Sequence, residues 1–119
     1  MSDLPLVDLD QIERLNEWGG SALQRKMIEL FLTHAKERMD QIKGGISSGD
    51  ANAAETGAHT LKSSAGNVGA RRVQELAQEA EALAEEQKLD DLKAMLPSLD
   101  AAFEEACAAL VDVLDGVEE

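Results

Sequence analysis

Nearly the whole chain carries the hydrophobic period of amphipathic helices, and this pattern restricts the possible fold more than any other feature. Between residues 21 and 46, apolar side chains recur at alternating steps of four and three. Similar spacing returns in the later segments, and glycines or small polar residues stand between them. Because one period accounts for almost every residue, the sequence predicts an all-α protein.

Sequence patterns also indicate where the helices begin and end. Ser21 with Gln24 resembles a capping box, and Asp50 is placed to cap the helix that follows it. We expect a short helix over about 8–18 and bundle helices over about 21–46, 50–67, 70–87 and 90–115. Short connections between long helices favour antiparallel neighbours. The sequence therefore predicts a single domain, residues 1–119, folded as an antiparallel up-down-up-down four-helix bundle with a short additional N-terminal helix.

The long helix expected over 21–46 carries two apolar stripes. The main stripe consists of Ile28, Leu32, Ala35, Met39, Ile42 and Ile46. A narrower second stripe, Leu23, Met27, Leu30 and His34, lies roughly 110° round the same helix at about 100° per residue. A helix with two apolar faces touches two neighbours, which we interpret as the bundle core and either the short first helix or a partner protein.

The formal net charge of −13 argues against nucleic acid or an anionic membrane surface as a partner. No stretch approaches the roughly 20 consecutive apolar residues that span a bilayer. The N-terminus also lacks the basic start and apolar run of a signal peptide. Cys107 is the single cysteine, so an intrachain disulfide is impossible. We expect a cytoplasmic monomer.

One of the two histidines stands in a chemically suggestive setting. His59 lies just outside the core stripe of its helix, and Lys62, Ser63 and Gly66 follow on the same side. A neutral imidazole is available near neutral pH to attack a phosphoryl group. Lys62 can reach the phosphoryl oxygens, while Ser63 and Gly66 leave room for a second protein to approach. This arrangement suits phosphoryl exchange with an aspartate.

The run His-Thr-Leu-Lys-Ser-Ser-Ala-Gly-Asn-Val-Gly, residues 59–69, resembles the signature of histidine-containing phosphotransfer (HPt) domains. The resemblance implies that His59 is the phosphorylated histidine, that Lys62 assists it and that Gly69 ends the helix. Ser63 stands where the family most often has glycine, a departure that keeps the site small.

HPt domains often present a polar side chain, commonly Gln, from the following helix to orient the imidazole. Counting along the chain aligns Glu81 with this position, and Gln78 one turn earlier is the competing assignment. The sequence leaves this choice open.

The resemblance implies a phosphorelay intermediate that exchanges phosphoryl groups with aspartates of response-regulator receiver domains. Its partners would be receiver domains, a hybrid sensor kinase, or both. Mg²⁺ would be held by the receiver, and we expect no cofactor or metal in this chain. Since no phosphate-binding glycine-rich loop is present, we also expect no autonomous kinase activity.

We expect partners to dock on Glu55 and Thr56, which precede His59 on its side of the helix, together with Leu23, Met27 and Leu30 of the second stripe. The alternative function is a non-catalytic acidic helical adaptor or inhibitor in which the histidine motif is coincidental.

Overall fold

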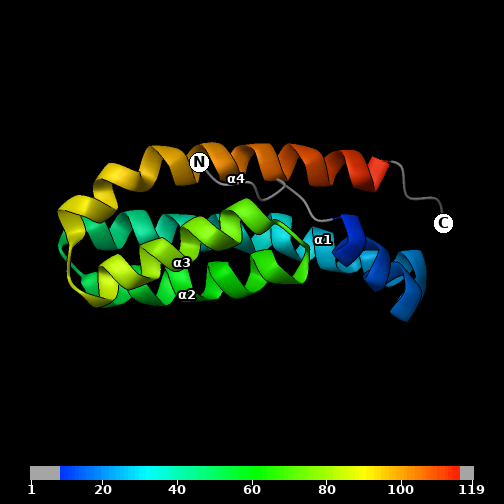
Figure 1. The fold of residues 1–119 in the computed structure, drawn as a ribbon, viewed down its shortest axis with the longest axis horizontal. Helices are drawn as coiled ribbons and strands as arrows, with labels where there is room; N and C mark the ends of the chain where they lie inside the picture. The colour runs from blue at the N-terminus through cyan, green and yellow to red at the C-terminus, as the bar shows by residue number, and fades with distance from the viewer. Residues whose placement is uncertain (1–8, 116–119) are drawn as a thin grey trace.

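The structure is a computed structural model, and it describes residues 9–115 of the chain. Four helices follow one another, α1 (Leu9–Ser48), α2 (Ala51–Asn67), α3 (Arg71–Glu85) and α4 (Leu89–Asp115). Consecutive helices pack together and α4 returns to α1, so that the helices surround one core (Figure 1). The predicted all-α four-helix bundle is confirmed. The limits of α2, α3 and α4 lie within two residues of the predicted ones, whereas α1 joins the predicted helices over 8–18 and 21–46 in one element.

The predicted break between a short first helix and a long bundle helix occurs at Gly20. The backbone there has φ 72° and ψ −171°, which is not helical, although α1 is assigned as one element. Glycine reaches positive φ without a Cβ clash, so this residue can turn the chain between two helical segments. Figure 1 shows the first turns of α1 bending away from the rest of the bundle. Asp8, the first residue of the predicted short helix, lies outside the described residues.

Both ends of α2 are set by residues that the sequence analysis identified. The Asp50 side chain accepts a hydrogen bond from the backbone N–H of Ala53 at 3.0 Å, so it caps the first turn. At the other end Gly69 has φ 74°, and its N–H donates to the carbonyl of Gly66 at 3.3 Å. The reversal at Gly69 ends the helix and starts the chain back along α3.

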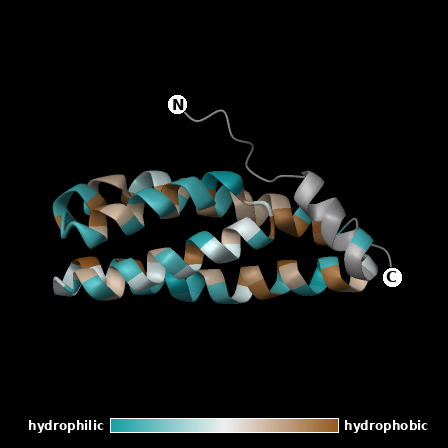
Figure 2. Cartoon of the chain, turned by 60° about the horizontal axis from the view of Figure 1, so that its bottom comes forward, coloured by the Kyte–Doolittle hydropathy of each residue, from teal (hydrophilic) through white to brown (hydrophobic). Residues whose placement is uncertain are grey.

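The core is built from aliphatic side chains and many alanines, and no polar or charged side chain of the described residues is buried. Figure 2 shows hydrophobic and hydrophilic residues alternating in bands along the helices, as expected where one face of each helix packs inward. Phe31 on α1 and Phe103 on α4 place their ring centroids 6.2 Å apart. No helix in residues 9–115 is long and apolar enough to cross a membrane.

Two glycines allow α1 and α2 to approach closely. A Cβ on Gly45 would come within 2.7 Å of backbone atoms of Asp50 and Ala54. A Cβ on Gly57 would come within 3.1 Å of Ile42. The close contact fixes α2, the helix that carries His59, against α1.

Candidate functional site

His59 projects from α2 into solvent. Its neighbours Ala58 and Leu61 are completely buried, whereas 61% of the His59 side chain is exposed. The core residues hold the helix in place, and the imidazole remains accessible to another protein.

A carboxylate on α3 joins His59 to Lys62. One oxygen of Glu81, Oε2, lies 2.7 Å from Nδ1 of His59, and the other, Oε1, accepts a hydrogen bond from Nζ of Lys62 at 2.6 Å. Lys62 stands one turn along α2 from His59, so both residues face α3 together. The three side chains form one connected polar cluster, which we call the His59 triad.

The Glu81 carboxyl is held in its ionised form. Its pKa lies below the ordinary value of 4.5, first because Lys62 donates a hydrogen bond to it and then because His59 contacts it, while burial acts in the opposite direction. An ionised carboxylate only accepts hydrogen bonds, so Nδ1 of the neutral imidazole must carry the proton. Nε2 then holds the free lone pair.

Of the two residues considered for orienting the ring, the structure brings Glu81 against His59. Gln78 is exposed and lines a separate cavity of about 310 Å³ together with Arg71, Gln74 and Glu75, all from α3. The geometry therefore favours Glu81 as the residue that contacts the imidazole.

The small residues beside His59 have different surroundings. Ser63 is exposed. Gly66 lies beneath the amide of Gln74, whose Nε2 would be 2.9 Å from a Cβ at that position. No motif in the sequence marks Gln74, because its contact with Gly66 depends on how α3 packs on α2.

The second stripe of α1 lines an open groove against α2. Met27, Leu30 and Phe31 from α1 meet Ser64 and Asn67 from α2 around a cavity of about 200 Å³. The Leu30 side chain is 39% exposed. This groove contains two of the three stripe residues predicted for docking, and the third, Leu23, is partly buried one turn before Met27.

Glu55 and Thr56, which were predicted for docking, lie on α2, and the second histidine, His34, lies on α1. Thr56 is exposed and its hydroxyl donates to the carbonyl of Asn52 at 3.0 Å, while Glu55 is partly buried. His34, the second histidine, borders the α1–α2 groove, and its Nδ1 lies 3.6 Å from Oε2 of Glu37. Glu37 stands on the same helix as the histidine that it contacts, whereas Glu81 joins His59 to Lys62 from a neighbouring helix.

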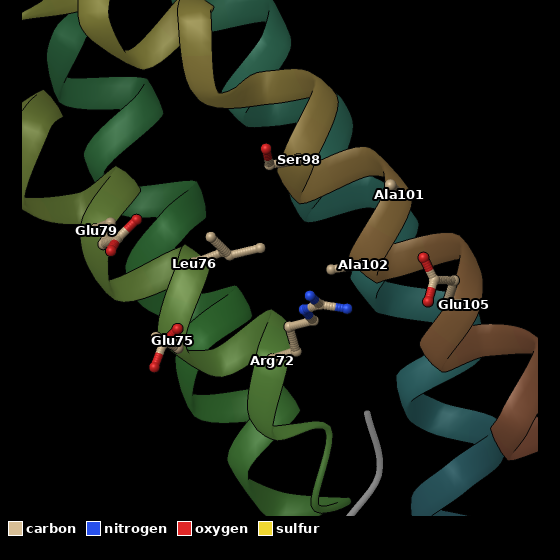
Figure 3. Close-up of a pocket in the computed structure, with 8 residues that line it drawn as sticks. All are labelled: Arg72, Glu75, Leu76, Glu79, Ser98, Ala101, Ala102 and Glu105. Carbon is tan, nitrogen blue, oxygen red and sulfur yellow. The ribbon is translucent and has the colours of Figure 1, made fainter. Parts of the chain in front are cut away.

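A larger cavity, about 600 Å³, lies between α3 and α4 (Figure 3). Leu76 and Arg72 extend from α3 toward small residues of α4, and Glu105 stands on the far side (Figure 3). The lining contains neither His59 nor Lys62. Among the side chains that the structure describes, there is no group of three or more placed to bind a metal ion.

Comparisons with known protein families and sequences give one family match. The sequence model of a family described as the Hpt domain matches residues 26–113. No curated protein sequence matches the chain.

Two solved structures share the fold. Histidine-containing phosphotransfer protein B (HptB) from Pseudomonas aeruginosa superposes with a TM-score of 0.89 at 20% identity, over 96% of this chain and 98% of that one. The HPT domain of a sensor hybrid histidine kinase from Shewanella gives a TM-score of 0.81 at 20% identity, over 96% and 97% of the two chains.

Proposed function

This chain belongs to the Hpt domain family, and we propose that His59 is the residue on which it carries the phosphoryl group. Its function is histidine phosphotransfer in a phosphorelay. The observation that supports His59 is its place in the His59 triad: the imidazole is exposed, and Glu81 contacts Nδ1 so that Nε2 is left free. Lys62, at the same carboxylate, supplies positive charge within one helical turn.

In the proposed reaction, Nε2 of His59 attacks the phosphorus of an aspartyl phosphate on a receiver domain. The bond from phosphorus to the aspartate oxygen breaks, and the carboxylate leaves with the electron pair. Because the transition state of phosphoryl transfer is loose, positioning and charge stabilisation supply most of the catalysis. Lys62 stabilises the phosphoryl oxygens, Glu81 orients the ring, and Mg²⁺ is held by the receiver domain.

The partners we propose are receiver domains, with a hybrid sensor kinase as a further source or acceptor of phosphoryl groups. We also propose that the chain acts as a cytoplasmic monomer and does not phosphorylate itself from ATP. The sequence contains no nucleotide-binding motif that would support a kinase reaction.

We propose that a receiver domain covers His59 and extends to the α1–α2 groove. The groove residues Ser64 and Asn67 lie five and eight positions beyond His59, which is no more than about 12 Å along the axis of α2. An interface of standard size buries about 800 Å² on each partner and spans more than this distance. Exposed Leu30 and the partly buried Met27 then give the receiver an apolar contact beside the reacting histidine.

The test is phosphoryl transfer from a phosphorylated receiver domain to the wild type, to His59→Gln and to His34→Gln. The chain has only these two histidines, so the variants are matched controls for each other. We expect the wild type and His34→Gln to acquire acid-labile, base-stable phosphate and His59→Gln to acquire none. Transfer to His59→Gln at the wild-type rate would disprove the assignment.

A further inference from the structure

Glu81 binds both residues that the proposed reaction uses. Its two carboxylate oxygens lie 2.7 Å from Nδ1 of His59 and 2.6 Å from Nζ of Lys62. The Glu81 side chain is only 18% exposed, compared with 28% for Lys62 and 61% for His59. Before any phosphoryl group arrives, the ammonium group of Lys62 is therefore already paired with a partly buried carboxylate.

A phosphoryl group on Nε2 would bring a second anion to the same ammonium group. Such a group adds about 1.5 to 2 negative charges near neutral pH. Lys62 is one turn from His59 and can reach it, but a single ammonium is a compact point charge on one flexible stem. Its three N–H donors can reach both anions, but Glu81 and the phosphoryl oxygens must then share its single positive charge. The two anions compete for Lys62, and they also repel each other.

We propose that Glu81 restrains Lys62 from pairing fully with the phosphoryl group, so that Lys62 stabilises phosphorylated His59 less than it otherwise would. This inference rests on the function proposed above and adds a regulation of the same site. It makes Glu81 a positioning residue, since its effect on the phosphoryl group acts through Lys62. This effect through Lys62 moves the exchange equilibrium toward the receiver aspartate. The direct contact of Glu81 with the Nδ1–H of the phosphorylated ring acts in the opposite direction, and only the first effect depends on Lys62.

The bonds that change do not include Glu81. When His59 accepts the group, the Nε2–phosphorus bond forms and the bond to the aspartate oxygen breaks. In the return step a receiver carboxylate attacks phosphorus, the phosphorus–nitrogen bond breaks, and Nε2 regains its lone pair. Nδ1 keeps its proton in both directions, so the imidazole leaves as a neutral ring. Since Glu81 takes no part in these bonds, its effect is on the equilibrium between the phosphorylated chain and the phosphorylated receiver.

A double-mutant cycle tests the proposal. The wild type, Glu81→Gln, Lys62→Met and the double variant are each mixed with a receiver domain carrying radiolabelled phosphate. The ratio of phosphorylated chain to phosphorylated receiver is measured at equilibrium. For each background we take the ratio of Glu81→Gln divided by the ratio of the protein with Glu81. We expect this quotient to be roughly three- to tenfold higher with Lys62 present than in the Lys62→Met background. The glutamine retains a carbonyl oxygen that can accept from Nδ1–H, so the ring remains oriented.

The matched control is Glu85→Gln, which removes the same charge from an exposed site one turn further along α3. We expect it to change the ratio by less than about twofold. Equal effects of Glu81→Gln with and without Lys62, or an equal effect of Glu85→Gln in folded protein, would overturn the inference. If wild-type His59 acquired no phosphate, the proposed function would fail, and this inference with it; circular dichroism of each variant confirms that it is folded.

Discussion

Gly44 and Gly45 are adjacent in α1, and replacing each with alanine should change stability in opposite directions. Alanine is favoured over glycine inside a helix by about 1 kcal/mol. A Cβ on Gly44 meets nothing within 4 Å, so Gly44→Ala should gain roughly this amount. A Cβ on Gly45 would lie 2.7 Å from the amide nitrogen of Ala54 and from the carbonyl oxygen of Asp50.

The contacts at Gly45 are with backbone atoms that cannot rotate away. Favourable contacts between heavy atoms lie at about 3.5–4.0 Å, so α1 and the start of α2 would have to separate by about 1 Å. Overpacking of this kind costs about 1–3 kcal/mol. Because the atoms that a Cβ on Gly45 would meet belong to the backbone, we expect the cost of Gly45→Ala to lie near the upper end of this range. After the gain in helix propensity, we expect a net loss of about 2 kcal/mol.

Urea and thermal unfolding followed by circular dichroism measure both variants. The midpoint temperature should fall by about 8 °C for Gly45→Ala and rise by about 4 °C for Gly44→Ala. A stability change of the same sign in the two variants would refute the reasoning, because helix propensity alone treats the two positions alike.

Three further predictions concern the cap, the groove and the carboxylate. Asp50→Ala removes the bond to the Ala53 N–H and should lower the free energy of unfolding by about 0.5–2 kcal/mol in urea titrations; an unchanged value would contradict the cap. Leu30→Glu should weaken receiver binding in calorimetric titrations, whereas Val111→Glu, which changes a similarly exposed residue on α4, should not; equal weakening would argue against docking at the groove. The pKa of Glu81 is lower in the folded protein than its ordinary value of 4.5. The ionised carboxylate therefore contributes fully to the free energy of unfolding above pH 4.5, and this contribution is lost as the pH falls through the lower pKa of the folded state. The difference in unfolding free energy between wild type and Glu81→Gln, roughly 0.5–1 kcal/mol near pH 7, should therefore vanish in acid, and a pH-independent difference would count against the ionised contact.

The features that could be read from the sequence are those that depend on neighbouring residues in the chain. Helix type follows from the spacing of apolar residues, and the ends of α2 follow from Asp50 and Gly69, whose effects are confined to one turn. His59 and Lys62 share a face of one helix, so their proximity was also predictable.

The remaining features depend on how one helix packs on another. The choice between Glu81 and Gln78 requires the register of α3 on α2, which no local pattern determines. The close approach at Gly45 and the position of Gln74 beside Gly66 have the same origin. Sequence periodicity shows which face of a helix is apolar, but it does not show which residue on the neighbouring helix that face will meet.

The most direct test of the account is to locate the phosphoryl group on the imidazole ring. Nitrogen-15 NMR of the histidine rings should be recorded before and after phosphorylation by a receiver domain. We predict that phosphorus is attached to Nε2 of His59 and that Nδ1 retains the proton that it donates to Glu81. Phosphorus on Nδ1 of His59, or on His34, would contradict the account.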